Sequence, residues 1–209
     1  MYEMEDPLTL LSRDPPPKSV YKQYVLTKIT VFHERELRAM AKKNKYLNYF
    51  NVTVSGLSGK IHHSLSYVSS LSDVKNMRIH TKMLAGNYLT YQMKSEQSGG
   101  SSVCRLCSVG AYKPTESLSH ALATCSATSG VRNKILQQIQ DVTSQSQTEI
   151  YMQHMSEDQL TQYILDPCSL NLSTRIHPED PVVPALYKLC RDLCSAVDRV
   201  RWTKLRNLQ

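Results

Sequence analysis

Phenylalanine and tryptophan are scarce in this chain, with two and one among 209 residues, although tyrosine occurs twelve times. Long apolar runs are missing as well, since no stretch approaches the roughly 18 consecutive apolar residues that cross a bilayer. The first seventeen residues, MYEMEDPLTLLSRDPPP, lack the apolar segment and the cleavage site of a secretory signal. These absences argue against a membrane-spanning or secreted protein, and they predict an intracellular location, in the nucleus or the cytoplasm.

Charges of the two signs are out of balance. The chain carries 25 lysines and arginines against 18 acidic residues, which gives a net charge of +7. Such a basic surface suits a polyanion, with nucleic acid ahead of an anionic membrane, and we expect no membrane partner. Apolar residues make up 41 %, so a chain of this length can bury the core of one ordinary domain or of two small ones.

Apolar residues recur at helical spacing in several segments, and this pattern predicts a mainly α-helical fold. The expected helices cover about 19–49, 72–86, 130–142 and 158–165, and a last helix begins near 181–184, where proline fits the first turn. The last helix has an apolar stripe of Leu186, Cys190, Leu193, Val197 and Val200 and a basic end of Arg199, Arg201, Lys204 and Arg206. Cations at the end of a helix complement its dipole, which gives them a structural role.

The chain divides into four expected regions. Residues 1–17 end in three prolines and form a flexible leader. Residues 18–94 form a helical region, 95–130 a zinc-binding module that opens on a Ser- and Gly-rich tether at 95–102, and 131–209 a C-terminal helical region. The expected architecture is a helical domain with an inserted Cys-Cys-His-Cys zinc module.

Four residues in the middle of the chain have the spacing of a zinc site: Cys104, Cys107, His120 and Cys125. Two cysteines separated by two residues can place both thiolates on one ion from a tight turn, and a helix over 117–125 can supply the other two ligands. Four protein ligands leave no open position, so the predicted Zn²⁺ is structural. Its binding would stabilise a segment that is too small and polar to fold by burial alone.

Two other interpretations of these four residues stay open at this point. The cysteines and the histidine could be unrelated, or a cysteine–histidine pair could be catalytic, which requires an orienting acid and an oxyanion site that the sequence does not show. The remaining cysteines, Cys168, Cys190 and Cys194, do not make a second site, and we expect the last two to be small core residues.

The run CRLCSVGAYKPTESLSHALATC resembles the zinc-binding region that follows the reverse transcriptase of non-LTR (LINE-like) retrotransposons. In that family a Cys-x-x-Cys pair precedes Glu-Thr or Glu-Ser, two residues, a histidine, an apolar pair and a final cysteine. Glu116 and Ser117 match the acidic dipeptide, and the segments Ile79–Tyr88 and Tyr163–Asp166 resemble the flanks. The resemblance is firm over about 75–130, and it departs from the family at Ser108, where glycine is frequent.

The resemblance implies binding of RNA or DNA without catalysis. The chain lacks the paired-aspartate motif of the polymerase and the acidic and histidine motifs of the endonuclease, so we expect no enzyme activity. The candidate phosphate contacts are the cations in and around the module: Lys75, Arg78, Lys82, Arg105, Lys113, Arg132 and Lys134. Three tyrosines, Tyr88, Tyr91 and Tyr112, are candidates for stacking on unpaired bases.

The alternative function is a helical protein-interaction module in which zinc only braces the helices. A protein that carries a reverse transcriptase would be such a partner. Basic helix faces are commonly just solvent-exposed, and tyrosines often lie at core edges. The sequence therefore leaves both functions open, together with a decayed fragment that has none.

Overall fold

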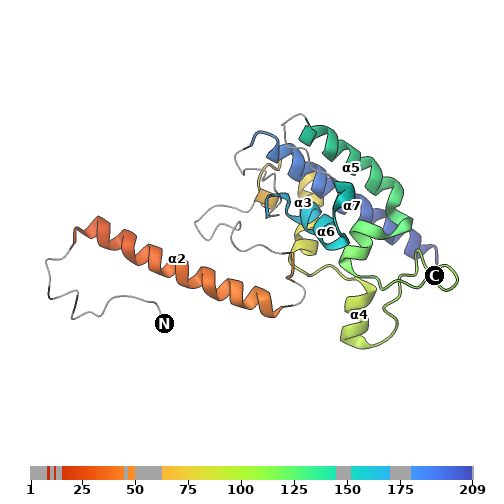
Figure 1. Cartoon of the computed structure of the whole chain (residues 1–209), viewed down its shortest axis with the longest axis horizontal. Coiled ribbons are helices and arrows are strands. Elements are labelled where there is room, and N and C mark those ends of the chain that lie inside the picture. Colours follow the sequence, from red (N-terminus) through yellow and green to blue (C-terminus); the bar gives the residue numbers. More distant parts are fainter. Residues whose placement is uncertain are drawn as a thin grey trace.

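The computed structural model describes residues 9, 12, 16–44, 47–49, 63–144, 152–169 and 180–208, and it confirms the mainly helical fold. The α-helices in order are α2 (Lys18–Lys43), α3 (Leu71–Leu84), α4 (Tyr91–Ser98), α5 (Ser129–Ser144), α6 (Glu157–Leu165) and α7 (Val183–Arg206) (Figure 1). The described ranges contain no β-strand, only isolated bridges near the cysteine pair. None of the helices described is both long enough and apolar enough to pass through a bilayer.

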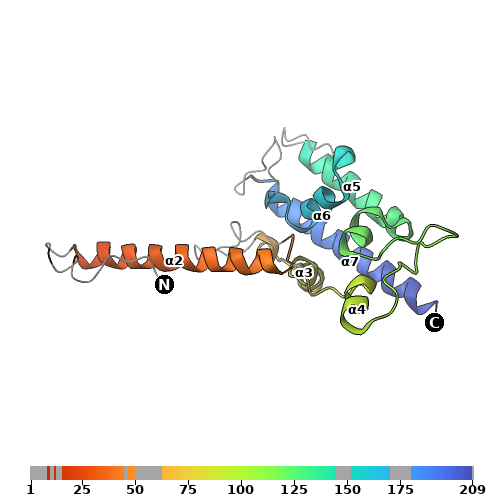
Figure 2. The same ribbon diagram turned by 60° about the horizontal axis from the view of Figure 1, so that its bottom comes forward.

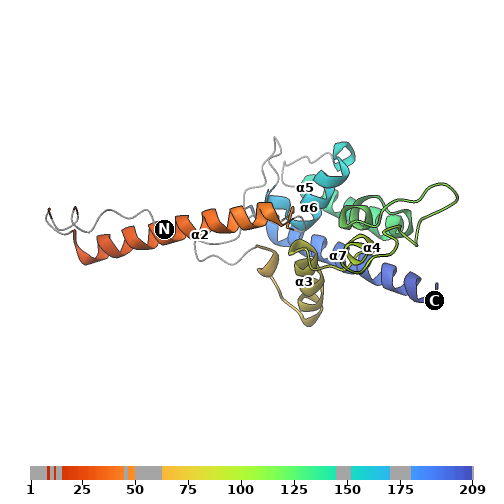
Figure 3. The same ribbon diagram turned by 90° about the horizontal axis from the view of Figure 1, so that it is seen from below.

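Helix α7 is the centre of the bundle, and α3 and α5 pack against it from opposite sides (Figures 2 and 3). Its buried positions recur every three or four residues, as expected for a helix with one apolar face. They include Leu186, Cys190, Leu193, Cys194 and Val197. The helix starts at Val183 with a proline in its first turn, so the predicted last helix is confirmed.

The three cysteines outside the candidate metal site lie in the apolar core. Cys168 and Cys190 pack in a cluster with Tyr163 and Tyr187, and Cys194 packs in a neighbouring cluster. All three are buried free thiols. The prediction that Cys190 and Cys194 are small core residues is confirmed.

The ends of the shorter helices follow their capping residues. The hydroxyl of Ser70 accepts a hydrogen bond from the Asp73 N–H at 3.1 Å, so α3 begins slightly earlier than expected, and Gly86 with a φ of 68° follows its end. Ser156 and Gln159 cap α6 reciprocally, and this helix ends before Pro167 as predicted.

Two expected boundaries differ in the structure. Residues 95–98, predicted as part of a tether, form the end of α4, because the side chain of Thr90 accepts from the Met93 N–H and caps that helix. The first helix, expected to reach about residue 49, ends at Lys43. Of the predicted leader 1–17, only residues 9, 12, 16 and 17 are among those described.

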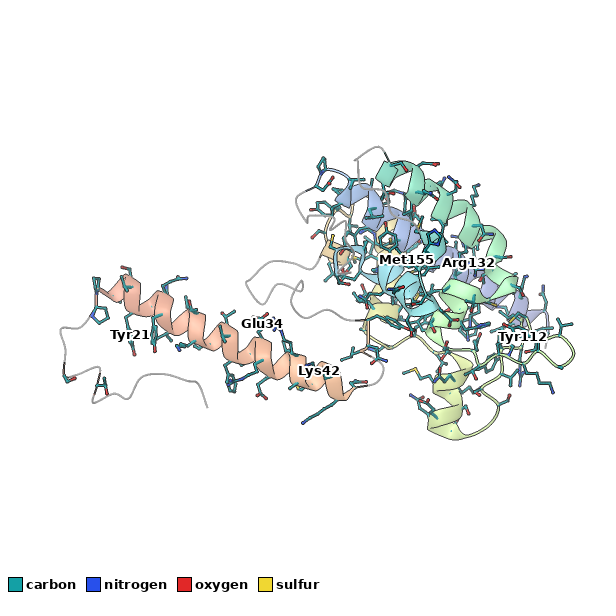
Figure 4. The ribbon with its side chains drawn as sticks, viewed as in Figure 1. Tyr21, Glu34, Lys42, Tyr112, Arg132 and Met155 are labelled. Carbon is teal, nitrogen blue, oxygen red and sulfur yellow. The ribbon has the colours of Figure 1, made fainter. Side chains whose placement is uncertain are left out.

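Helix α2 stands apart from the bundle in all three views (Figures 1 to 3). None of its residues whose burial is described is buried, and Val20, Val31 and Met40 each expose more than half of their surface. Figure 4 shows Tyr21 near the end of α2 that is far from the bundle and Lys42 near the end that faces it. The apolar face of α2 is therefore not part of the described core.

Candidate metal centre and its surroundings

The first two cysteines lie in a tight turn at the base of a short antiparallel pairing. The Cys104 N–H donates to the carbonyl of Pro114 at 2.8 Å, and the Glu116 N–H donates to the carbonyl of Ser102 at 2.8 Å. Cys104 is fully buried and Cys107 nearly so. The pairing therefore holds both thiols on the inner side of the turn.

A second turn closes the outer end of this pairing. The backbone groups of Val109 and Tyr112 exchange hydrogen bonds of 3.1 and 3.0 Å. Between them, Gly110 has a φ of 56°, a conformation that glycine adopts without strain. The glycine thus allows the chain to reverse between the two halves of the module.

His120 and Cys125 come from a wide helical turn. The helix that begins at Leu118 becomes π-helical over His120–Thr124, where the Cys125 N–H donates to the His120 carbonyl at 2.7 Å. Five residues of a regular α-helix span about 500°, which would leave the two side chains about 140° apart. The wider turn reduces this angle. The helix predicted over 117–125 is confirmed in position, but its turn between His120 and Cys125 is π-helical. Such turns are rare in proteins, and those that occur are often at functional sites.

The four predicted ligands meet at one point inside the module. Their ligand atoms all lie within 4.8 Å of one another, and all four residues are buried. The Cys104 and Cys125 sulfurs are 3.9 Å apart, and the Cys107 sulfur lies 3.2 Å from the His120 Nε2. Tetrahedral zinc with sulfur bonds of about 2.3 Å would hold two sulfurs about 3.8 Å apart. The cluster can therefore hold a metal ion.

The protein groups by themselves shift the pKa values of the three thiols in different directions. The pKa of Cys104 is raised to about 12, because its thiol donates to Cys125 and because it is buried. The same hydrogen bond lowers the pKa of Cys125, whereas burial raises the pKa of Cys107. Metal ligation requires thiolates, so metal binding at this cluster would displace protons.

A polar chain behind His120 fixes the ring in the tautomer that ligates a metal. The Nδ1 lies 3.1 Å from the Thr124 hydroxyl, which in turn donates to the Glu157 carboxylate at 3.1 Å. Because the hydroxyl proton points to Glu157, the hydroxyl accepts from Nδ1–H. The Nε2 then carries the free lone pair, and it points into the cluster.

Replacing Thr124 with valine is expected to weaken metal binding by about 10- to 100-fold, because the His120 ring loses the partner that fixes its tautomer and orientation. Competition with a chromophoric chelator measures the change. Thr203→Val, an exposed threonine of α7, is the matched control and should leave metal affinity unchanged. Equal affinity for Thr124→Val and the unchanged protein would show that the polar chain does not orient the ligand.

A buried ion pair joins the module to the central helix. The Arg201 guanidinium donates to both oxygens of Glu116, with distances of 2.8 and 3.1 Å, and the Tyr91 N–H donates to the same carboxylate at 2.8 Å. Glu116 and Arg201 are 1 % and 3 % exposed. Burial is the largest single effect and lowers the pKa of Arg201, but the hydrogen bonds and negative charges of Glu116 and Tyr88 together raise that pKa. The module is thereby anchored to α7.

The sequence does not predict this pair, because the helix dipole already accounts for Arg201 and the family resemblance already accounts for Glu116. A signal was present. The buried positions of α7 continue from Val197 to Arg201 and Leu205 in steps of four. A cation on an otherwise apolar stripe indicates a buried partner, since arginine is rarely buried unpaired.

Two of the seven candidate phosphate contacts lie on the paired segment 103–115, one in the cysteine turn and one just after the second turn. Arg105 and Lys113 are exposed, and the Arg105 guanidinium lies 5.1 Å from the centre of the Tyr91 ring. Tyr112 is 60 % exposed, and Figure 4 shows it at the outer end of the module. These three side chains are available to a partner.

Arg132 has an internal role, which corrects its prediction as a phosphate contact. It is buried, and its Nη1 donates to the Cys125 carbonyl at 2.9 Å and to the Thr128 hydroxyl at 3.2 Å. Burial lowers the pKa of its guanidinium. Arg132 therefore stabilises the backbone between Cys125, the last predicted ligand, and Thr128. It is no longer a candidate phosphate contact.

The other four candidates lie on different elements. Lys75, Arg78 and Lys82 are exposed on α3, and Lys134 is exposed on α5, on the other side of α7 (Figure 3). The structure does not gather all the predicted cations on one surface.

Two of the three candidate stacking tyrosines are engaged inside the protein. Tyr88 is buried, and its hydroxyl donates to Asp198 at 2.9 Å. The half-buried Tyr91 ring packs beside the guanidiniums of Arg105 and Arg201, at 5.1 and 5.9 Å. Neither ring is open to a base.

Comparison of the chain with protein-family models, with curated proteins and with solved structures found no match.

Proposed function

We propose that this is a non-catalytic nucleic-acid-binding protein whose cysteine module is stabilised by one zinc ion. Zinc would bind the sulfurs of Cys104, Cys107 and Cys125 and the Nε2 of His120. Three thiolates and an imidazole are soft and borderline donors, the set that structural zinc sites use. The resemblance of this run to the zinc-binding region of LINE-like retrotransposon proteins supports the same assignment.

Binding of nucleic acid is supported by the exposed cations at one end of the molecule. Arg105 and Lys113 lie on the paired segment 103–115, and Arg199 and Arg206 lie near the end of α7. Figures 1 to 3 place this segment and the end of α7 at the same end of the bundle. No ion pair joins any of these four cations to a residue that the structure describes. Unpaired exposed cations on a rigid support suit phosphates.

The test is a salt series of binding to a labelled single-stranded oligonucleotide, with metal-loaded and chelated protein. If all four cations bind phosphates, the slope of log K against log salt concentration should be about −3, since each contact contributes about −0.7 on single strands. Arg105→Gln should weaken binding and reduce the slope by about 0.7. Chelation should weaken it more, because the cysteine turn then loses its shape.

The matched control is Lys75→Gln, which removes the same charge from the exposed face of α3. It should leave the slope nearly unchanged. If Arg105→Gln and Lys75→Gln changed the salt slope equally, the nucleic-acid interface would not be at the end of the molecule that carries Arg105. Absence of oligonucleotide binding at low salt would refute the proposed function.

A second candidate function, binding of a protein, is favoured by one observation. Val20 and Val31, eleven residues apart and therefore on one face of α2, are more than half exposed, on a helix with no buried residue among those described. A partner protein with a complementary apolar groove could bury this helix. Under this function, oligonucleotide binding at physiological salt would be weak, and replacing both valines with glutamine would abolish capture of the partner.

A further inference from the structure

Trp202, the one tryptophan of the chain, lies on the surface of α7 with 41 % of its area exposed. Single exposed apolar residues are common on proteins and need no explanation by themselves. Trp202 is distinguished by two features of its surroundings, namely a fixed support beneath the ring and cations on both sides of it.

The support is the buried ion pair. The Arg201 guanidinium carbon lies 5.0 Å from the centre of the Trp202 ring, and Glu116 fixes that guanidinium through two hydrogen bonds. Further along the helix, the Lys204 ammonium donates to the Ala127 carbonyl at 3.0 Å. The indole therefore lies on a rigid base, which lowers the ordering cost when a ligand binds.

The flanking cations are Arg199 and Arg206, three residues before and four residues after Trp202. Side chains at these spacings are neighbours on one helix face, with Cβ atoms about 5–6 Å apart. All three residues line one surface depression, together with Ser195, Asp198 and Thr203. The one carboxylate there, Asp198, accepts a hydrogen bond from the Tyr88 hydroxyl at 2.9 Å, and both arginines are exposed.

We propose that this depression binds one unpaired base of a single-stranded nucleic acid. The base stacks on the Trp202 indole, and Arg199 and Arg206 contact the phosphates on its two sides. The inference rests on the proposed nucleic-acid function and specifies its ligand. A single strand is the expected ligand because a duplex keeps its bases stacked inside, whereas an aromatic ring accepts any unpaired base.

The indole itself reports the binding, since no other tryptophan contributes to the emission. Titration of the zinc-loaded protein with 12-nucleotide oligothymidylate and oligouridylate should quench this emission, and the two arms compare DNA with RNA. A duplex of the same length and inorganic polyphosphate carry the charge without an unpaired base. Both should leave the emission nearly unchanged.

Variants separate stacking from charge. Trp202→Leu should lower the affinity for the oligonucleotide by about 5- to 150-fold, the range for loss of one base–aromatic stack, and Trp202→Phe should retain most of it. Arg199→Gln with Arg206→Gln should weaken binding without altering the ring. Leu208→Ala, which removes an exposed apolar side chain just beyond α7, is the matched control and should bind as the unchanged protein does. Circular dichroism confirms that each variant is folded.

The outcomes distinguish this site from the function on which it rests. Salt-sensitive binding with unchanged emission and undiminished affinity in Trp202→Leu would refute the stacking site and leave the proposed function standing. Equal quenching by polyphosphate or by the duplex would also overturn it. Failure of the unchanged protein to bind any oligonucleotide at low salt would refute both.

Discussion

Replacing Cys107 with serine is expected to reduce the metal content from about one ion per chain to nearly none and to unfold the cysteine module. Structural zinc supplies about 10–16 kcal/mol of apparent binding free energy, which matches or exceeds the whole stability of a typical domain, about 5–15 kcal/mol. Cys107 is nearly buried, and its sulfur lies 3.2 Å from the His120 Nε2. A serine hydroxyl there leaves only three of the donors that the site needs.

Elemental analysis gives the metal content, and hydrogen exchange of the amides over 102–128 gives the folding of the module. The matched control is Cys168→Ala, which removes a buried thiol outside the cluster. It should keep the full metal content at a modest cost in stability. Full metal content and unchanged protection in the Cys107→Ser variant would refute the metal centre.

Replacing Glu116 with leucine is expected to destabilise the protein by about 3–5 kcal/mol, since it leaves the Arg201 guanidinium buried without a countercharge. For a chain of this size the unfolding midpoint should fall by about 6–20 °C. Thermal denaturation followed by circular dichroism measures the effect. The double change Glu116→Leu with Arg201→Met should recover most of the loss, because two apolar side chains can replace a buried ion pair.

An exposed ion pair of the same helix provides the control. The Lys188 ammonium lies 2.9 Å from the Asp192 carboxylate, and the Lys188 side chain is 54 % exposed. Lys188→Ala should cost no more than about 1 kcal/mol, as is usual for surface pairs. A similar cost for Glu116→Leu would mean that the buried pair does not anchor the module.

The metal cluster could be predicted because its four ligands lie close together in the sequence. The two cysteines of the turn, Cys104 and Cys107, differ by three positions, and His120 and Cys125 lie on one short helical segment. Ligand spacing of this kind limits where the side chains can go. The π-helical turn was not predictable, because it follows from how the last two ligands converge rather than from the helix propensity of the segment.

The position of Arg201 on the apolar stripe of α7 indicates that its side chain is buried, but the sequence does not tell which residue it pairs with. Glu116 and Arg201 are 85 residues apart, so no local pattern couples them. The sequence around Arg132 does not tell whether its guanidinium points inward to the Cys125 carbonyl or outward to solvent. Exposure of the apolar face of α2 was equally hidden, because an amphipathic pattern predicts a helix but does not tell what covers it.

The separation of Glu116 from Arg201 also sets the order in which a growing chain can complete this structure. The four sulfur and nitrogen donors emerge from the ribosome within 22 residues, Cys104 to Cys125, and closing so short a loop costs little entropy. The arginine is made 85 residues after its carboxylate. At about 5–20 residues per second, this is a delay of about 4–17 s. A metal ion can thus bind the four donors well before the chain has a core, and the bundle is complete only once α7 has been made.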